Sequence, residues 1–168
     1  MKNVYLEVTM KVYFAAPLFS EADQMYNAYL AKKIRQEFPE IDLYVPQEQA
    51  DINDKSKYAD STMIAKVDTD KVLESDLMIA LLDGTGMDAG VAAEIGIAFA
   101  REIPILGLFT DVRTQGAEVV EKLEALKIPG ESQFAYVNLY VVGLIRQRGE
   151  VYSHTEDLLK KLKEYREQ

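Results

Sequence analysis

Residues 88–100, DAGVAAEIGIAFA, form a predicted helix with one carboxylate among apolar neighbours. Within 89–100, every residue other than Glu94 is apolar or glycine. At 100° per residue, Glu94 lies within about 60° of Val91 and Ala98, so a helix rotated to expose Glu94 would expose them too. An unpaired ionised carboxylate in a core costs several kcal/mol, on the scale of a domain's net stability. Glu94 is therefore either neutral and bonded to the backbone, or used in chemistry.

A carboxylate that faces a crevice, with a second acid nearby, suits covalent chemistry at the anomeric carbon of a sugar. One carboxylate attacks the carbon, and the other acid helps the leaving group depart through an oxocarbenium-like transition state. The candidates for the second acid are Asp68, Asp76, Asp83 and Asp88. Asp76 and Asp83 flank a predicted strand, where a structural role in a turn is sufficient.

Asp68 and Asp88 each have a structural interpretation as well. Asp68 is close to Lys66 and Lys71 in the predicted helix, and this spacing by itself favours a solvated face of ion pairs. Asp88 belongs to the first turn of its helix, where the helix dipole favours an anion.

The glycines before this helix do not match a dinucleotide site. Gly84, Gly86 and Gly90 have the spacing G-x-G-x-x-x-G, one residue longer than the dinucleotide fingerprint, and the adjacent Asp83 and Asp88 would repel a pyrophosphate. Carboxylates at this turn are better suited to hydroxyl groups. A lone glutamate on an apolar helix face is also a poor Mg²⁺ site, so neither a cofactor nor a metal is expected.

Composition narrows the function classes further. The 168 residues suit one domain, 1–168, with 1–9 as a possible N-terminal extension. There is no cysteine and only one histidine, His154, which argues against thiolate or His-rich metal sites and Ser-His-Asp catalysis. The net charge of −9 disfavours nucleic acid and anionic membrane as partners. Without a membrane span or signal pattern, a cytoplasmic protein is expected.

The elements that must position the acids alternate between short β-branched runs and longer amphipathic segments, which is typical of a parallel sheet covered by helices. Strands are predicted at 11–15, 42–45, 77–82 and 105–109, with a fifth near Val151. Helices are predicted at 20–38, 61–75, 89–100, 117–126 and 155–167. The segment 135–146 is apolar and β-branched and fits either a helix or a strand; of the two, a helix is expected. Ser20 and Asp23 form a predicted capping box.

This pattern predicts an α/β fold: a flavodoxin-like doubly wound sheet, mainly parallel, with helices on both faces. Ligands of such sheets bind beyond the carboxyl ends of the strands. The segments 17–20, 46–51, 83–88 and 110–114 are therefore expected to surround one crevice.

Four segments in order resemble the nucleoside 2-deoxyribosyltransferase family. They are VYFAAPLFSEAD (12–23), LYVPQE (43–48), DTDKVLESDLMIALLDGTGMDAGVAAEIGIAFA (68–100) and VNLYVVGLI (137–145). The D-[SA]-G-x-A-x-E-[IL]-G pattern at 88–96 is the most specific of them. This chain has Ala15-Ala16-Pro17 where many members have glycine before the proline. Some members also use their terminal carboxylate in the site, but this chain ends in a charged helix, so that role is not assigned here.

The resemblance implies an enzyme that transfers 2-deoxyribose between purine and pyrimidine bases through a covalent deoxyribosyl-enzyme. Glu94 matches the family's nucleophile, and Tyr13 would hydrogen-bond and orient it. Asp88 would bind a sugar hydroxyl, and Asp68 would assist departure of the base. The implied partners are a deoxyribonucleoside donor and a free nucleobase acceptor.

The resemblance also implies residues that bind the substrate. Asn138 and Tyr140 match an element that reaches into a neighbouring subunit, which implies a homo-oligomer with shared active sites. Gln47, in a loop with Gln49, would contact the base, and Phe19 would flank it. Phe14 is an alternative for that role, although a core position suits both phenylalanines equally.

Two other functions fit the same residues. A nucleoside or nucleotide N-glycosidase would use Glu94 with water as the acceptor. A substrate with a 5'-monophosphate would need basic residues to bind the phosphate, and Arg113 is the one expected near the crevice. A non-catalytic nucleoside or nucleotide sensor would not need Glu94 at all.

Overall fold

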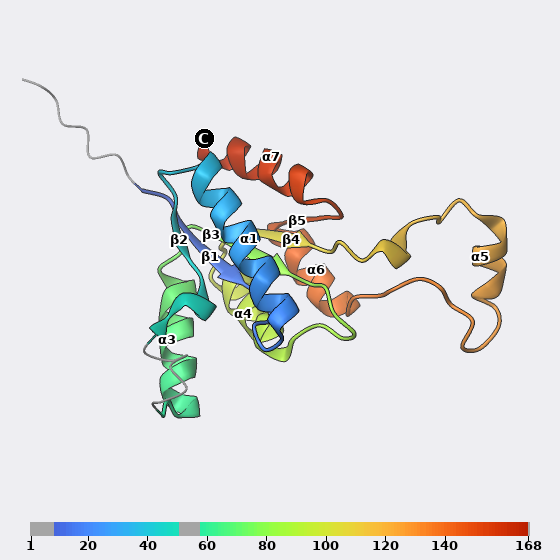
Figure 1. The fold of residues 1–168 in the computed structure, drawn as a ribbon, viewed down its shortest axis with the longest axis horizontal. Helices are drawn as coiled ribbons and strands as arrows, with labels where there is room; N and C mark the ends of the chain where they lie inside the picture. Colours follow the sequence, from blue (N-terminus) through green and yellow to red (C-terminus); the bar gives the residue numbers. More distant parts are fainter. Residues whose placement is uncertain (1–8, 51–57, 168) are drawn as a thin grey trace, which may run out of the picture.

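Five parallel strands form one sheet in the order β2-β1-β3-β4-β5, as the computed structural model of the chain shows for the described residues 9–50 and 58–167 (Figure 1). The strands are β1 (Lys11–Ala15), β2 (Asp42–Tyr44), β3 (Leu77–Leu81), β4 (Ile105–Leu108) and β5 (Gly149–Tyr152). This is the strand order of flavodoxin-like doubly wound sheets, so the predicted fold class is confirmed. The predicted extension, apart from its last residue, and Asp51 lie outside the described residues.

Helices cover both faces of the sheet. They are α1 (Glu21–Glu37), α3 (Ser61–Leu73), α4 (Ala89–Ala100), α5 (Val120–Ala125), α6 (Leu139–Arg148) and α7 (Thr155–Arg166). Alternate residues of each strand point to opposite faces. Val12 and Phe14 pack with α1 and α7, whereas Tyr13 and Ala15 pack with α4 and α6. Two core layers result, one on each side of the sheet.

The predicted helix boundaries hold where a side chain fixes the first turn. Ser20 and Asp23 form the expected capping box, with the Ser20 hydroxyl accepting from Asp23 N at 3.1 Å. The prediction for 135–146 starts too early, because the Asn138 side chain accepts from Tyr140 N and begins α6 at residue 139. The prediction for 117–126 is also too long: α5 spans only Val120–Ala125.

Two features direct the chain toward the carboxyl edge of the sheet. Gly84, in the turn between β3 and α4, has a φ of 135°, which side chains rarely adopt. A short 3₁₀ helix, Pro46–Glu48, follows β2.

In the part of the chain that the structure describes, no helix is both long and apolar enough to cross a membrane.

Candidate active site

A cavity of about 240 Å³ lies at the carboxyl ends of β1 and β3, on the side of the sheet that carries α3 and α4. Ligands of doubly wound sheets bind here, because the strand order reverses between these two strands. The lining residues come from the β1–α1 loop, the 3₁₀ helix, α3 and α4; they are Ala16, Leu18, Phe19, Pro46, Ile64, Asp68, Asp88, Gly90, Val91 and Glu94. Three of the acids singled out from the sequence therefore share one cavity.

Glu94 projects from α4 against the end of β1. The Tyr13 hydroxyl, which β1 supplies from the core, donates to Glu94 Oε1 at 2.7 Å. From the sequence, a neutral Glu94 bonded to the backbone was an alternative. In the structure, the hydrogen-bond partner of Glu94 is the side chain of Tyr13 instead. The pKa of Glu94 is raised to about 7: burial is the largest cause, the hydrogen bond from Tyr13 lowers the pKa, and the nearby Asp68 and Asp88 raise it. Near neutral pH the carboxylate is thus available as a weakly solvated nucleophile.

Asp68 faces the same cavity from α3 and is half buried. The structural interpretation as a solvated ion-pairing face is wrong for it, because both lysines pair elsewhere: Lys66 with Asp70 at 2.5 Å and Lys71 with Glu74 at 2.9 Å. Burial raises the pKa of Asp68 above its ordinary value. A carboxyl in this state is suited to donate a proton to a leaving base.

Tyr44 is a residue of the site that the sequence analysis did not single out. Its hydroxyl donates to Asp68 Oδ1 at 3.5 Å, and its ring stacks on that of Tyr13 with centroids 5.4 Å apart. Lys71 Nζ lies 5.9 Å from the centre of the Tyr44 ring. Tyr44 could have been identified from the register of the parallel strands, because Tyr13 and Tyr44 are paired positions of β1 and β2.

Asp88 is the N-cap of α4 as well as a lining residue of the cavity. Its Oδ1 accepts from Val91 N at 3.0 Å. The structural and functional interpretations therefore apply together, because the capping bond fixes the carboxylate at the rim beside the helix N-terminus.

The two phenylalanines separate clearly. Phe14 is fully buried in the core on the α1 side, whereas Phe19 lines the cavity and is 81% exposed.

Of the two glutamines, Gln47 is held away from the cavity, since its side chain accepts from Asn27 Nδ2 at 2.8 Å and donates to Gln24 O at 3.1 Å. Gln49 Nε2 donates to Val45 O at 3.3 Å. In the single chain, only Phe19 of these four residues contacts the cavity.

Asn138 and Tyr140 lie outside this cavity in the single chain. Asn138 begins α6 as its cap, and Tyr140 is 75% exposed. Both follow the segment that carries α5, which stands clear of the sheet in Figure 1.

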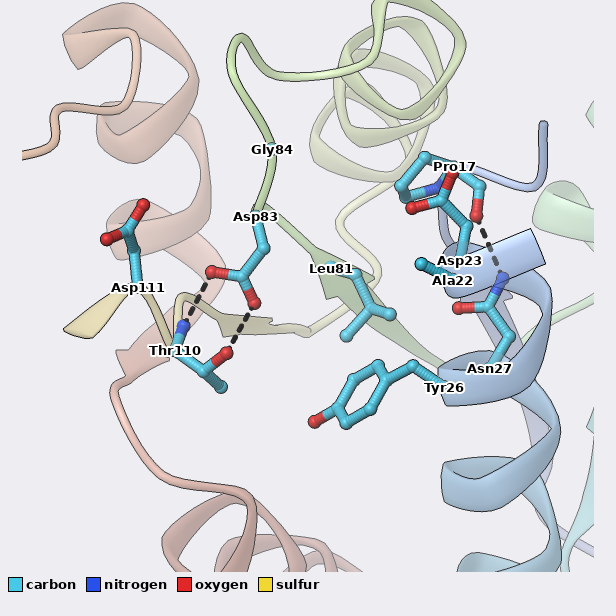
Figure 2. Close-up of a pocket in the computed structure, with 10 residues that line it drawn as sticks. All are labelled: Pro17, Ala22, Asp23, Tyr26, Asn27, Leu81, Asp83, Gly84, Thr110 and Asp111. Atoms are coloured by element: carbon cyan, nitrogen blue, oxygen red, sulfur yellow. Dashed lines mark hydrogen bonds between the residues drawn. The ribbon is translucent and has the colours of Figure 1, made fainter. Parts of the chain in front are cut away.

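Asp76 and Asp83 have the structural roles expected of them. Asp76 accepts from Lys11 N at 2.8 Å and fixes the start of β1. Asp83 accepts from both Thr110 N and Thr110 Oγ1 at 2.7 Å and joins the loops after β3 and β4 (Figure 2).

The segments expected around one crevice are divided, among the described residues, between the cavity that Glu94 lines and a second one. The second, of about 310 Å³, is shown in Figure 2 and is lined by residues of α1 and of the loops after β1, β3 and β4. The sheet edge and the β1–α1 loop separate them: Pro17 lines the second cavity, whereas its neighbours Ala16 and Leu18 line the first. Arg113 pairs with Asp111 at 2.5 Å, and Asp111 lines the second cavity.

Comparisons with known proteins agree with this geometry. The sequence model of the nucleoside 2-deoxyribosyltransferase family matches residues 12–139. Among solved structures, a conserved protein from Enterococcus faecalis is 58% identical, with a TM-score of 0.89 over 94% of this chain and 99% of that one. A comparison with curated protein sequences finds no significant match.

Two more distant structures share the fold. A 2-deoxyribosyltransferase from Bacillus psychrosaccharolyticus has a TM-score of 0.60 and 16% identity, over 89% of this chain and 90% of that one. A 2-deoxyribosyltransferase from Leishmania mexicana has a TM-score of 0.63 and 20% identity, over 92% of this chain and 97% of that one. Both have the same arrangement of sheet and helices as this chain.

Proposed function

This chain belongs to the nucleoside 2-deoxyribosyltransferase family, and on that premise we propose that it transfers 2-deoxyribose from one nucleobase to another. The substrates are a deoxyribonucleoside donor and a free purine or pyrimidine acceptor. The observation that carries the proposal is the hydrogen bond of 2.7 Å between Tyr13 and Glu94, a carboxylate that lines one cavity together with Asp68 and Asp88.

In the first half-reaction, a Glu94 carboxylate oxygen forms a bond to the anomeric carbon of the donor. The bond from that carbon to the base nitrogen breaks, the electron pair leaves with the base, and Asp68 supplies the proton that the base takes up. In the second half-reaction, a nitrogen of the acceptor attacks the same carbon, the bond to Glu94 breaks, and Asp68 regains a proton. Atoms and charges balance over the cycle without a cofactor.

The other side chains have supporting roles in this scheme. Tyr13 holds Oε1 of Glu94, so the orientation of the nucleophile is fixed before the substrate binds. Asp88, fixed at the rim by its capping bond, binds a hydroxyl of the sugar. Phe19, exposed at the cavity mouth, stacks on the base.

We further propose that Asn138 and Tyr140 complete the site of a second copy of the chain. Both are exposed at the start of α6, next to a segment rich in exposed apolar side chains: Val120, Leu123, Leu126, Ile128, Tyr136 and Leu139. Clustered exposed apolar residues are typical of interaction surfaces. Gln47 reaches the base only if its bond to Asn27 is exchanged, so we assign it a role in shaping the loop.

The test is chromatography of the protein incubated with deoxyinosine, with and without cytosine. Base exchange predicts deoxycytidine that depends on cytosine, with little free deoxyribose. Free deoxyribose regardless of cytosine would instead indicate a hydrolase. Binding without conversion would indicate a sensor and overturn the proposal. A donor with a 5'-phosphate is expected to be a poor substrate, because neither lysine nor arginine is among the described residues that line the catalytic cavity.

A further inference from the structure

The second cavity at the carboxyl edge, shown in Figure 2, is not used by the proposed reaction. We propose that it binds a small planar molecule carrying an amino group, and that its occupancy acts on the catalytic cavity through Asn27. Aminated nucleobases are the members of this class closest to the chemistry of the chain, and in naming them the inference rests on the proposed function.

The first argument is an unpaired acceptor in the cavity wall. Asn27 is the one polar residue in the described core, 2% exposed, and its Oδ1 has no hydrogen-bond partner among the described residues. Figure 2 shows its carboxamide oxygen turned toward the space between α1 and the loop after β3. A buried acceptor without a donor is destabilising, because its lost hydration is not compensated. The protein is therefore stabilised by anything that brings an N–H or O–H group to this wall.

The second argument is the charge of the lining. Asp23, Asp83 and Asp111 line the cavity, and none of its lining residues in the described part of the chain is a lysine or an arginine. Arg113 neutralises Asp111, but no ion pair involves Asp23 or Asp83 within the described ranges 9–50 and 58–167. The remaining field is negative, so it favours a ligand that donates hydrogen bonds and disfavours an anion.

The third argument is the shape of the walls. Tyr26 lines the cavity, with its hydroxyl 3.0 Å from Thr155 Oγ1, and Pro17 and Leu81 are apolar neighbours. Apolar and aromatic walls with a few convergent acceptors are typical of sites for small heterocycles. A flat ring with an amino group meets both requirements, since the ring packs on the walls and the amino group supplies the donors.

Asn27 links the second cavity to neighbours of residues that line the catalytic cavity. Its Nδ2 donates to Pro17 O at 2.8 Å and to Gln47 Oε1 at 2.8 Å. Pro17 adjoins the cavity-lining Ala16 and Leu18, and Gln47 adjoins the cavity-lining Pro46. A donor on Oδ1 polarises the carboxamide and strengthens both Nδ2 bonds. Occupancy of the second cavity thus fixes two rim segments of the catalytic cavity.

The experiment uses calorimetric titration of the purified full-length protein with cytosine and with uracil, which has an oxo group in place of the amino group. Two binding events per chain are expected for cytosine and one for uracil. Ala22→Leu places a larger side chain at the wall of the second cavity and is expected to weaken the second cytosine event at least tenfold. Ala28→Leu, at an exposed site of the same helix that does not line the cavity, is expected to retain both events.

Coupling is measured in the Glu94→Gln variant, which binds without turnover. Cytosine also occupies the catalytic cavity and competes there with deoxyuridine, so the apparent Kd of deoxyuridine is measured at increasing cytosine concentration. This Kd is expected to rise about fivefold less in Glu94→Gln than in Glu94→Gln combined with Ala22→Leu, because only the former binds cytosine in the second cavity. One cytosine event unaffected by Ala22→Leu, or the same rise of the deoxyuridine Kd with and without Ala22→Leu, would overturn the inference. If the wild type exchanges bases but the second cytosine event is absent, the proposed function stands and this inference fails. If two cytosine events occur but no base exchange is seen, the inference stands and the proposed function fails.

Discussion

The contact between Tyr13 and Glu94 is the smallest unit from which the chemistry follows. A phenol in the core of β1 donates to a carboxylate on α4, 81 positions further along the chain. The bond favours the ionised form of Glu94, whereas burial disfavours it. The balance leaves a carboxylate that is ready to react near neutral pH and is poorly solvated.

Replacing Glu94 with glutamine tests the nucleophile. The change is nearly isosteric, so the fold is expected to persist while kcat falls by three or more orders of magnitude, because no covalent intermediate forms. Mass spectrometry of the wild type with donor alone is expected to show one added deoxyribosyl group, absent from the variant. Glu37→Gln, at an exposed position of α1, is the matched control. Normal turnover by the Glu94 variant would refute the assignment.

The pH dependence of kcat/KM follows from the same carboxylate. Because the reactive form is ionised and its pKa is about 7, activity is expected to fall as the pH drops below 7, about tenfold per unit. Tyr13→Phe removes the bond that lowers this pKa, so the ascending limb is expected to move to higher pH. Tyr152→Phe removes a hydroxyl that bonds Glu150 instead, and an equal displacement in that variant would argue against the role of Tyr13.

Stability is expected to change in the opposite direction from activity. The folded chain raises the pKa of Glu94 from 4.5 to about 7, so the stabilisation from its protonated form is complete below pH 4.5 and lost as the pH rises through 7. Glu94→Gln is therefore expected to be more stable than the wild type at pH 8, by roughly 1–3 kcal/mol, with the difference vanishing near pH 4.5. Denaturant unfolding at both pH values measures it, and equal stability at pH 8 would contradict the burial argument.

At the scale of single residues, the sequence predicted the acids better than their neighbours. Glu94 was identified from helical spacing, which depends only on local geometry. Asp68 was ambiguous, because whether a helical carboxylate meets lysines or a cavity depends on how α3 sits against the sheet. Tyr44 could be identified only with the register of β1 and β2, a non-local property.

At the scale of elements, capping links the fold to the site. The first turn of α4 is fixed by Asp88 and that of α3 by Asp60, whose side chain accepts from Met63 N at 2.8 Å. The capping box of α1 was predictable because it involves neighbours in sequence. The start predicted for α6 was too early. The apolar residues before Asn138 fit a helix, but the Asn138 side chain caps α6, so the helix begins at residue 139.

Asp88→Asn separates capping from substrate binding. An asparagine still caps the helix, so stability is expected to stay within about 0.5 kcal/mol while KM for the donor rises, because the charged acceptor for the sugar hydroxyl is gone. Asp88→Ala is expected to lose about 0.5–2 kcal/mol as well. Asp60→Ala removes a cap outside the lining of the catalytic cavity and measures the capping loss alone. Unchanged donor KM in Asp88→Asn would remove Asp88 from the binding site.

At the scale of the whole molecule, the single chain accounts for the grouping of Glu94, Asp68 and Asp88 but not for the predicted roles of Asn138 and Tyr140. The two-layer core and the strand order followed from periodicity and the handedness of crossovers. Two cavities in place of one did not, because their separation depends on the path of the β1–α1 loop between them.

Mixing two inactive variants tests whether active sites are shared. Asn138→Ala is expected to raise KM for the nucleoside, and Glu94→Gln to abolish turnover. If subunits exchange, their mixture is expected to recover part of the wild-type rate, because some sites combine an intact Glu94 with an intact Asn138 from the other chain. Wild-type protein mixed with Glu94→Gln corrects for simple dilution. A mixture no more active than the sum of its components, with exchange verified by mass, would contradict sharing.

The stacked pair of tyrosines has a consequence for how such an enzyme can change over time. Tyr13 and Tyr44 hold the two acids from inside the sheet, on neighbouring strands in fixed register, with ring centroids 5.4 Å apart. In the proposed reaction, the loops that would meet a base begin only beyond the ends of those strands. Substitutions, insertions and deletions in the loops can therefore alter which bases are accepted while the acids keep their spacing. The chemistry is inherited with the core, and substrate preference is free to diverge at the rim.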